Sequence, residues 1–202
     1  MRHMIRSAIL WMIFSYFVGS FPTGYLLVRL FKGLDIRTVG SGSTGATNVR
    51  RVMGNKWAVI VTAIDMLKGA LSLLFTVASV GVSPIHLSLS GFAVVLGHNF
   101  PIWLKFKGGK GVATTYGVVF FLWPYESFAV ALMSGAIWYA IMSSTHYVSL
   151  ASIFSLLSIP IFFGMLDAPY PFIVVSFVLA VFAMVRHKSN IERLSNGKEN
   201  KV

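Results

Sequence analysis

The chain has 202 residues, of which 56% are hydrophobic and only 11% are charged, whereas soluble domains carry about 25% charged residues. This composition excludes an ordinary soluble domain and indicates an integral membrane protein. The net charge is +11, but the basic residues cluster between long apolar runs, which favours anionic lipid and anionic substrates over nucleic acid. Cysteine is absent, which excludes disulfide bonds, thiol nucleophiles and cysteine-bound metals.

Apolar runs of roughly 20 residues can cross a bilayer as helices, and this chain has a series of them. We expect an all-α integral membrane protein built as a seven-transmembrane-helix bundle, or six spans if the fourth run is re-entrant. The predicted spans are 5–31, 57–80, 84–104, 112–123, 127–142, 147–165 and 169–185. Pro22 should bend the first span. No small-residue cleavage site follows it, so we expect this helix to be retained.

Basic residues collect in alternate connections between the predicted spans. The connections after spans two, four and six contain no Lys or Arg, and basic loops stay in the cytoplasm. This predicts an N-terminus outside and a cytoplasmic C-terminus. The chain 1–202 would form a single polytopic domain, with the basic loops 32–56 and 105–111 and the tail 186–202 together on the cytoplasmic face.

The first basic loop contains VGSGSTGATNVRR at 39–51, which is close to two phosphate-binding motifs. The dinucleotide motif G-x-G-x-x-G needs a preceding strand, and the P-loop needs a lysine where Ala46 stands. The spaced glycines still favour an anion-binding nest of backbone N–H groups, with hydroxyls as further donors. A flexible connector is the alternative. The residues concerned are Gly40, Ser41, Gly42, Gly45, Thr47, Asn48 and Arg51.

Within span two, Asp65 and Lys68 lie three residues apart on one helix face. Intramembrane charges are often functional, and an internal ion pair is the equal alternative. At the end of span three, His98 could be a general base or a buried polar residue. It lacks the H-x-x-x-x-D motif of many lipid acyltransferases, because Trp103 stands five residues later.

The second basic loop reads FKGGKG and precedes an apolar helix, whose N-terminus would favour an anion. An ordinary positive-inside loop is the alternative. The candidate phosphate-binding residues here are Lys107, Gly108, Gly109, Lys110 and Gly111.

Two further segments place polar residues at predicted cytoplasmic ends. Ser149 begins span six, where a hydroxyl often bonds only its own helix backbone. His187 ends span seven, and Asn190 follows about one turn later. Neighbouring cations should oppose protonation of His187 and leave an imidazole that can accept a proton. A lipid-attracted basic tail is the alternative, and no spacing of ligands suggests a metal site.

Three segments, in order, resemble the bacterial acyl-phosphate:glycerol-3-phosphate acyltransferase family. The segment 40–51 resembles its GSGN-x-GATN-x-x-R loop, 97–114 its GH-x-FP…FKGGKGVAT loop, and 186–199 its RH-x-x-NI-x-RL-x-x-G-x-E tail. The likeness covers nearly the whole chain. Ser43 stands where the family has Asn, and His146 stands where Arg is expected before Tyr147.

The resemblance implies an enzyme that transfers a fatty acyl group from acyl phosphate to glycerol 3-phosphate, giving lysophosphatidic acid and inorganic phosphate. It implies no cofactor, metal or obligate protein partner, and a multi-pass location in the bacterial inner membrane with the site facing the cytoplasm. Ser41, Arg51, Lys110 and His187 would be catalytic, and the remaining loop residues above, with Ser149 and Asn190, would bind substrate. A transporter of phosphorylated solutes is the alternative from another class.

Overall fold

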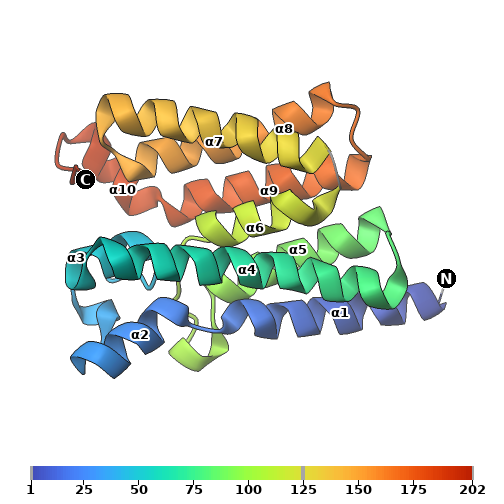
Figure 1. Cartoon of the computed structure of the whole chain (residues 1–202), viewed down its shortest axis with the longest axis horizontal. Coiled ribbons are helices and arrows are strands. Elements are labelled where there is room, and N and C mark those ends of the chain that lie inside the picture. The colour runs from blue at the N-terminus through green and yellow to red at the C-terminus, as the bar shows by residue number, and fades with distance from the viewer. Residues whose placement is uncertain (1, 124–125, 202) are drawn as a thin grey trace. The chain divides into compact units, whose positions relative to one another are not determined.

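The computed structural model describes residues 2–123 and 126–201, and that part of the chain is helical and contains no strand. The elements are α1 (Arg2–Ser20), α2 (Thr23–Lys32), η1 (Ile36–Thr38), α3 (Ala46–Met53), α4 (Asn55–Val80), α5 (Pro84–Asn99), η2 (Ile102–Leu104), α6 (Val112–Leu122), α7 (Glu126–Thr145), α8 (Val148–Met165), α9 (Tyr170–Arg186) and α10 (Lys188–Ser195) (Figure 1). The chain forms two compact units, Met1–Val118 and Val119–Val202, which are described in turn.

Membrane-spanning candidates account for most of these helices. Among the described residues, five helical stretches are long and apolar enough to cross a membrane, and there are six if α9 and α10, bent by 59°, count as one span. The helix α6 is apolar but shorter. The predicted all-helical membrane architecture is therefore confirmed. The first predicted span contains a break, because Pro22 has no N–H to continue the hydrogen-bond ladder of α1.

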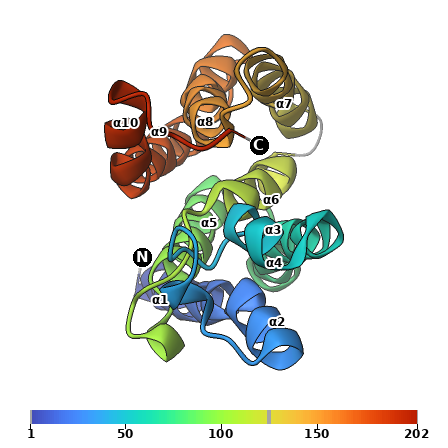
Figure 2. The same cartoon turned by 90° about the vertical axis from the view of Figure 1, so that its left-hand side faces the viewer.

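In the first unit, α1 packs against α4 and α5, and the short helix α3 packs against α4 (Figure 2). Small residues allow close approach. A Cβ added at Gly117 of α6 would lie 1.9 Å from the carbonyl oxygen of Met66 in α4. Such glycine contacts are typical of helices that associate in lipid, where packing replaces the hydrophobic effect.

The interior of this unit holds polar as well as apolar side chains, and many large apolar side chains also face outward. Ser72 Oγ donates to Ser15 Oγ over 2.7 Å, joining α4 to α1, and Thr76 Oγ1 donates to Ser90 Oγ over 3.0 Å, joining α4 to α5. Leucines such as Leu10 face outward. This arrangement suits lipid, where hydroxyls pair across helices and aliphatic chains meet the bilayer.

In the second unit, α7 packs on α8, α8 packs on α9, and α10 touches both α8 and α9. The helix α10 begins directly after His187, where α9 ends. The bend brings the polar segment 188–199 back to the beginning of α8, where Ser149 lies.

Candidate active site

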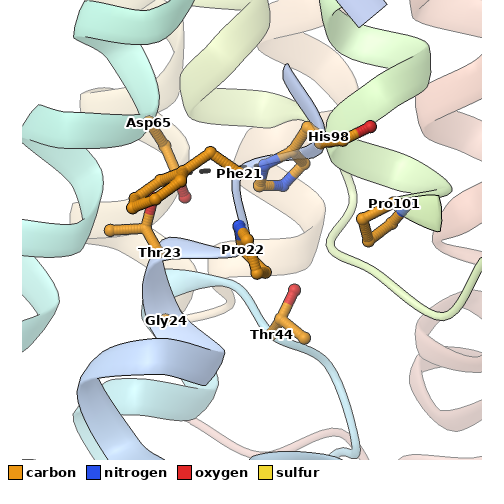
Figure 3. Close-up of a pocket in the computed structure, with 9 residues that line it drawn as sticks. Phe21, Pro22, Thr23, Gly24, Thr44, Asp65, His98 and Pro101 are labelled. Atoms are coloured by element: carbon orange, nitrogen blue, oxygen red, sulfur yellow. Dashed lines mark hydrogen bonds and ion pairs between the residues drawn. The ribbon is translucent and has the colours of Figure 1, made fainter. Parts of the chain in front are cut away.

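The break between α1 and α2 determines where the first basic loop lies against α2. Beyond Pro22, Gly24 lies against the backbone of Thr44, and a Cβ added at Gly24 would sit 2.1 Å from the carbonyl oxygen of Thr44. Only a glycine permits this approach. The break therefore holds the end of loop 33–45 against the start of α2, as Figure 3 shows for Gly24 and Thr44.

The first loop is closed by the buried amide of Asn48 in α3. Its Nδ2 has two N–H donors and lies within hydrogen-bonding distance of three carbonyl oxygens, those of Ile36 at 3.2 Å, Val39 at 3.0 Å and Ser43 at 2.9 Å. Its Oδ1 accepts from the N–H of Ser41 at 3.0 Å. One amide thus satisfies polar groups along most of the loop, which favours a structural role for Asn48.

Glycine is required in this loop for two different reasons, backbone conformation and close packing. Gly40 and Gly42 have φ of 60° and 70°, the left-handed region that glycine tolerates best. A Cβ at Gly40 would also lie 2.2 Å from Asn48 Oδ1 and 3.8 Å from Arg51 Cδ. The structure therefore brings Gly40, Ser41, Asn48 and Arg51 together. Ser41 and Arg51 are exposed there.

Arg37 joins this loop to the second one, and the sequence patterns above did not single it out. Arg37 Nη2 lies 2.6 Å from Asp35 Oδ2, and its Nη1 donates to the carbonyl oxygen of Leu104 at 3.1 Å. The hydrogen bond from Arg37 holds the pKa of Asp35 down to about 2, and the same bond raises the pKa of Arg37. The sequence signal that could have indicated this ion pair is the D-x-R spacing of Asp35 and Arg37.

The second basic loop folds back on the end of α5. Gly109 N–H donates to the carbonyl oxygen of His98 at 3.1 Å, and Gly108 N–H donates to that of Asn99 at 3.2 Å. A Cβ at Gly108 would lie 2.3 Å from the carbonyl oxygen of His98, so this glycine is needed for close packing. Gly111 has φ of 81°. The loop holds Lys110 half-buried, whereas Lys107 is exposed.

Beneath this loop lies a buried polar cluster. Lys68 Nζ is 2.8 Å from Asp65 Oδ1, so these two residues form the ion pair that was one of the two alternatives for their spacing. The same nitrogen is 2.8 Å from His98 Nδ1, and Thr23 Oγ1 donates to Asp65 Oδ1 at 3.0 Å. Figure 3 shows Thr23, Asp65 and His98 around one small hollow, which Thr44 and Pro101 also line.

In the second unit, Glu199 gathers three side chains. Its Oε1 accepts from Asn190 Nδ2 at 2.6 Å and from Ser149 Oγ at 2.9 Å, and its Oε2 accepts from Arg193 Nε at 2.7 Å. Burial alone would raise the pKa of Glu199, but these hydrogen bonds outweigh it and lower the pKa. We call Ser149, Asn190, Arg193 and Glu199 the tail clamp. Glu199 was missed as a site residue, although it ends the tail pattern quoted above.

His187 is buried at the junction of α9 and α10. Its Nδ1 lies 2.7 Å from the carbonyl oxygen of Ala183. A carbonyl can only accept, so Nδ1 carries the proton, and in the neutral ring Nε2 is then the acceptor. This tautomer suits a residue that takes up a proton at Nε2.

The predicted site residues thus fall into groups within each unit. The first unit contains the loop of Gly40, Ser41, Gly42, Gly45, Thr47, Asn48 and Arg51, together with the segment of Lys107, Gly108, Gly109, Lys110 and Gly111. Arg37, shortly before the first group, donates to the carbonyl oxygen of Leu104, shortly before the second. The second unit contains Ser149, His187 and Asn190, of which Ser149 and Asn190 meet at Glu199.

Comparison with known proteins shows which family the chain belongs to. The family model described as Glycerol-3-phosphate acyltransferase matches residues 9–197. A glycerol-3-phosphate acyltransferase of Aquifex aeolicus is 42% identical over 194 residues, covering 96% of this chain and 98% of the relative. Glycerol-3-phosphate acyltransferase 2 of Thermotoga maritima is 43% identical over 191 residues, covering 94% of each chain.

Two solved structures are also similar. One is the crystal structure of PlsY, an integral membrane glycerol 3-phosphate acyltransferase, in its glycerol 3-phosphate form, with a TM-score of 0.90, 42% identity and coverage of 97% of this chain and 96% of that one. The other is its lysophosphatidic acid form, with a TM-score of 0.87, 41% identity and coverage of 96% and 95%.

Proposed function

Because the chain belongs to the glycerol-3-phosphate acyltransferase family, we propose that it transfers a fatty acyl group from acyl phosphate to glycerol 3-phosphate. The chain is an acyltransferase of phospholipid synthesis, and the proposal concerns its donor and its site. The similar structures are of forms with glycerol 3-phosphate and lysophosphatidic acid, the acceptor and the product of this reaction.

The observation that carries the proposal is the pairing of two glycine-dependent loops in the first unit, each of which holds a cation. Arg51 lies beside Gly40, and Lys110 directly follows Gly109, which packs on His98. Acyl phosphate and glycerol 3-phosphate both carry phosphate, so their mutual repulsion must be offset before they can react. Fixed cations and oriented N–H groups offset it.

The proposed step is a direct displacement. The acceptor hydroxyl of glycerol 3-phosphate attacks the carbonyl carbon of acyl phosphate, the new ester C–O bond forms, and the bond from that carbon to the phosphate oxygen breaks. The hydroxyl proton passes either to the departing phosphate or to His187 Nε2. Acyl phosphate is already an activated anhydride, so the step needs no covalent enzyme intermediate.

Each site residue has a role in this step. Arg51, Lys110 and the backbone N–H groups near Ser41 and Gly42 hold phosphate and stabilise the negative charge that develops on the carbonyl oxygen. Asn190 and Ser149, ordered by Glu199, help to orient glycerol 3-phosphate. Thr47 and Lys107 complete the binding surface.

We also propose the finer topology on which this site depends. The chain would form one polytopic domain of seven spans, with the N-terminus outside and the C-terminus in the cytoplasm of a bacterium. The basic connections and the sequence of the short apolar helix α6 support this arrangement. The three basic segments would then all face the cytoplasm.

The donor is tested with purified protein in lipid, given glycerol 3-phosphate and either palmitoyl phosphate or palmitoyl-CoA. We expect lysophosphatidic acid and phosphate to appear in equal amounts with palmitoyl phosphate alone. Lysophosphatidic acid formed only from palmitoyl-CoA would refute the proposed donor.

The role of Lys110 is tested by Lys110→Ala, which should lower kcat/KM by about a hundredfold or more, as expected for loss of one donor that stabilises the transition state. Lys56→Ala is the matched control, because Lys56 is an exposed cation in the same predicted cytoplasmic region. If folded Lys110→Ala protein turned over like the wild type, Lys110 would have no part in the site.

A further inference from the structure

The buried cluster of Asp65, Lys68 and His98 has no role in the step above. These side chains are only 2%, 6% and 8% exposed, and they lie within helices that are apolar enough to span a membrane. Charged groups in such helices are rare, and they normally serve a function. The contacts of the cluster indicate what that function is.

Lys68 fixes the ring of His98. An ammonium group has three N–H donors and no acceptor. Lys68 Nζ lies 2.8 Å from Asp65 Oδ1, 2.8 Å from His98 Nδ1 and 3.3 Å from the carbonyl oxygen of Phe21. Because the ammonium can only donate, His98 Nδ1 accepts, and the proton of the neutral ring lies on Nε2.

The other side of the ring faces the second basic loop. A Cβ added at Gly109 would lie 2.0 Å from His98 Nε2 and 2.8 Å from its Cε1. The backbone of the same histidine accepts from Gly109 N–H at 3.1 Å. Gly109 therefore rests directly on the imidazole, and the next residue along the chain is Lys110.

We propose that His98, oriented by the Lys68–Asp65 pair, is a positioning residue. Its ring supports the backbone at Gly109 and so fixes the position of the loop that carries Lys110. The inference rests on the role proposed above for Lys110. His98 acts here as a rigid support and transfers no proton. Lys68 also holds the carbonyl oxygen of Phe21, at the break where the first loop is held, so one buried cation ties both loops to α4.

The first test compares the same substitution at two histidines of α5. His98→Asn keeps an acceptor where Nδ1 stood but removes Nε2 and Cε1, the two ring atoms nearest to Gly109. His86→Asn is the matched control. His86 is similarly buried in the same helix, and its ring bonds Ser7 at 2.9 Å and Ser83 at 2.8 Å, away from the second loop.

We expect His98→Asn to raise the KM of at least one of the two phosphate substrates about tenfold or more, whereas His86→Asn leaves both KM values unchanged. If His98 had a purely structural role, both variants would give less folded protein, and the folded fraction of each would have the wild-type KM. That result would overturn the proposal. Wild-type KM for both substrates in His98→Asn would overturn it equally.

The second test measures the coupling between His98 and Gly109. Gly109→Ala should weaken phosphate binding strongly in the wild type, because the new methyl group meets the ring. In a His98→Asn background the same change should have at least tenfold less effect, because the two ring atoms that would come closest to the new methyl group are gone. Equal effects in both backgrounds would mean that the ring does not support the loop.

The readouts separate this inference from the proposed donor. The wild type, His98→Asn, Gly109→Ala and the double variant form a double-mutant cycle. Binding of glycerol 3-phosphate and of inorganic phosphate is titrated for all four proteins, which needs no acyl donor. If wild type turned over only palmitoyl-CoA but the cycle were strongly non-additive in these titrations, the donor proposal would fail and the support role of His98 would stand. An additive cycle with normal turnover of palmitoyl phosphate would overturn the support role and leave the donor proposal intact.

Discussion

At the scale of single residues, the shape of the first loop depends on one amide. Asn48 contacts backbone groups from Ile36 to Ser43 and places Ser41 next to the residue pair of Gly40 and Arg51. The family resemblance suggested that Asn48 binds substrate directly. Its hydrogen bonds favour a role in shaping the surface that does so.

Asn48→Ala should therefore impair catalysis through the loop. Each buried polar group left without a partner costs roughly 1–3 kcal/mol, and about 1.4 kcal/mol lost from transition-state stabilisation is about tenfold in rate. We expect kcat/KM to fall at least about tenfold in steady-state assays. Asn55→Ala, at an exposed position shortly after α3, should behave like the wild type. Unchanged kinetics in Asn48→Ala would show that the loop holds its shape without this amide.

At the scale of helices, contacts between backbones decide where glycine is required. Gly117 meets the carbonyl oxygen of Met66, so Gly117→Ala should push α4 and α6 apart and lower the thermal unfolding temperature. Gly135 of α7 has no atom within 4 Å of an added Cβ. Gly135→Ala should leave that temperature unchanged or raise it, since alanine is favoured in a helix by roughly 0.5–1 kcal/mol. Equal stability of the two variants in thermal unfolding would contradict the close contact.

The tail clamp should be sensitive to acid. The pKa of Glu199 is lowered from its ordinary value of 4.5, so the clamp is fully formed above pH 4.5 and is lost as the pH falls through the folded-state pKa, where Glu199 takes up a proton. Glu199→Gln lacks the charge at every pH.

We expect Glu199→Gln at pH 7 to be cut by trypsin after Arg193 or Lys198 several times faster than the wild type. Glu192→Gln is the control, because Glu192 is an exposed carboxylate of the helix α10, which directly precedes the segment of Glu199. Equal cleavage rates in limited proteolysis would show that Glu199 does not hold the tail.

The helices were predictable from sequence to a useful degree, because their signals are local. Apolar runs located all the long helices, and Pro22 indicated the break in the first. The helix α3 was expected only as part of a loop, since its sequence is polar and its helical form depends on packing against α4. The partners of Asn48 and Glu199 were not predictable, because such bonds depend on which distant backbone and side-chain atoms the fold brings near.

At the scale of the whole molecule, the proposed topology can be tested by a method that the sequence itself simplifies. The chain has no cysteine, so single cysteines can be introduced without a background. We expect Lys56→Cys and Lys198→Cys to react with an impermeant maleimide only in permeabilised cells. Val82→Cys, at an exposed position after α4, should react in intact cells. Labelling of all three in intact cells would refute the proposed orientation.

The Asn48 contacts join residues close together in the sequence, whereas the tail clamp joins residues far apart. This difference determines the order in which the two sets of contacts can form during translation. Asn48 bonds residues 5 to 12 positions before it, so the first loop can close while the next span is still in the ribosome. Ser149 bonds Glu199, 50 residues later, and cannot pair until translation has passed that point. A nascent chain would therefore form the first loop early and the tail clamp late. If the clamp orients glycerol 3-phosphate as proposed, acyl transfer would begin only after the tail has been made.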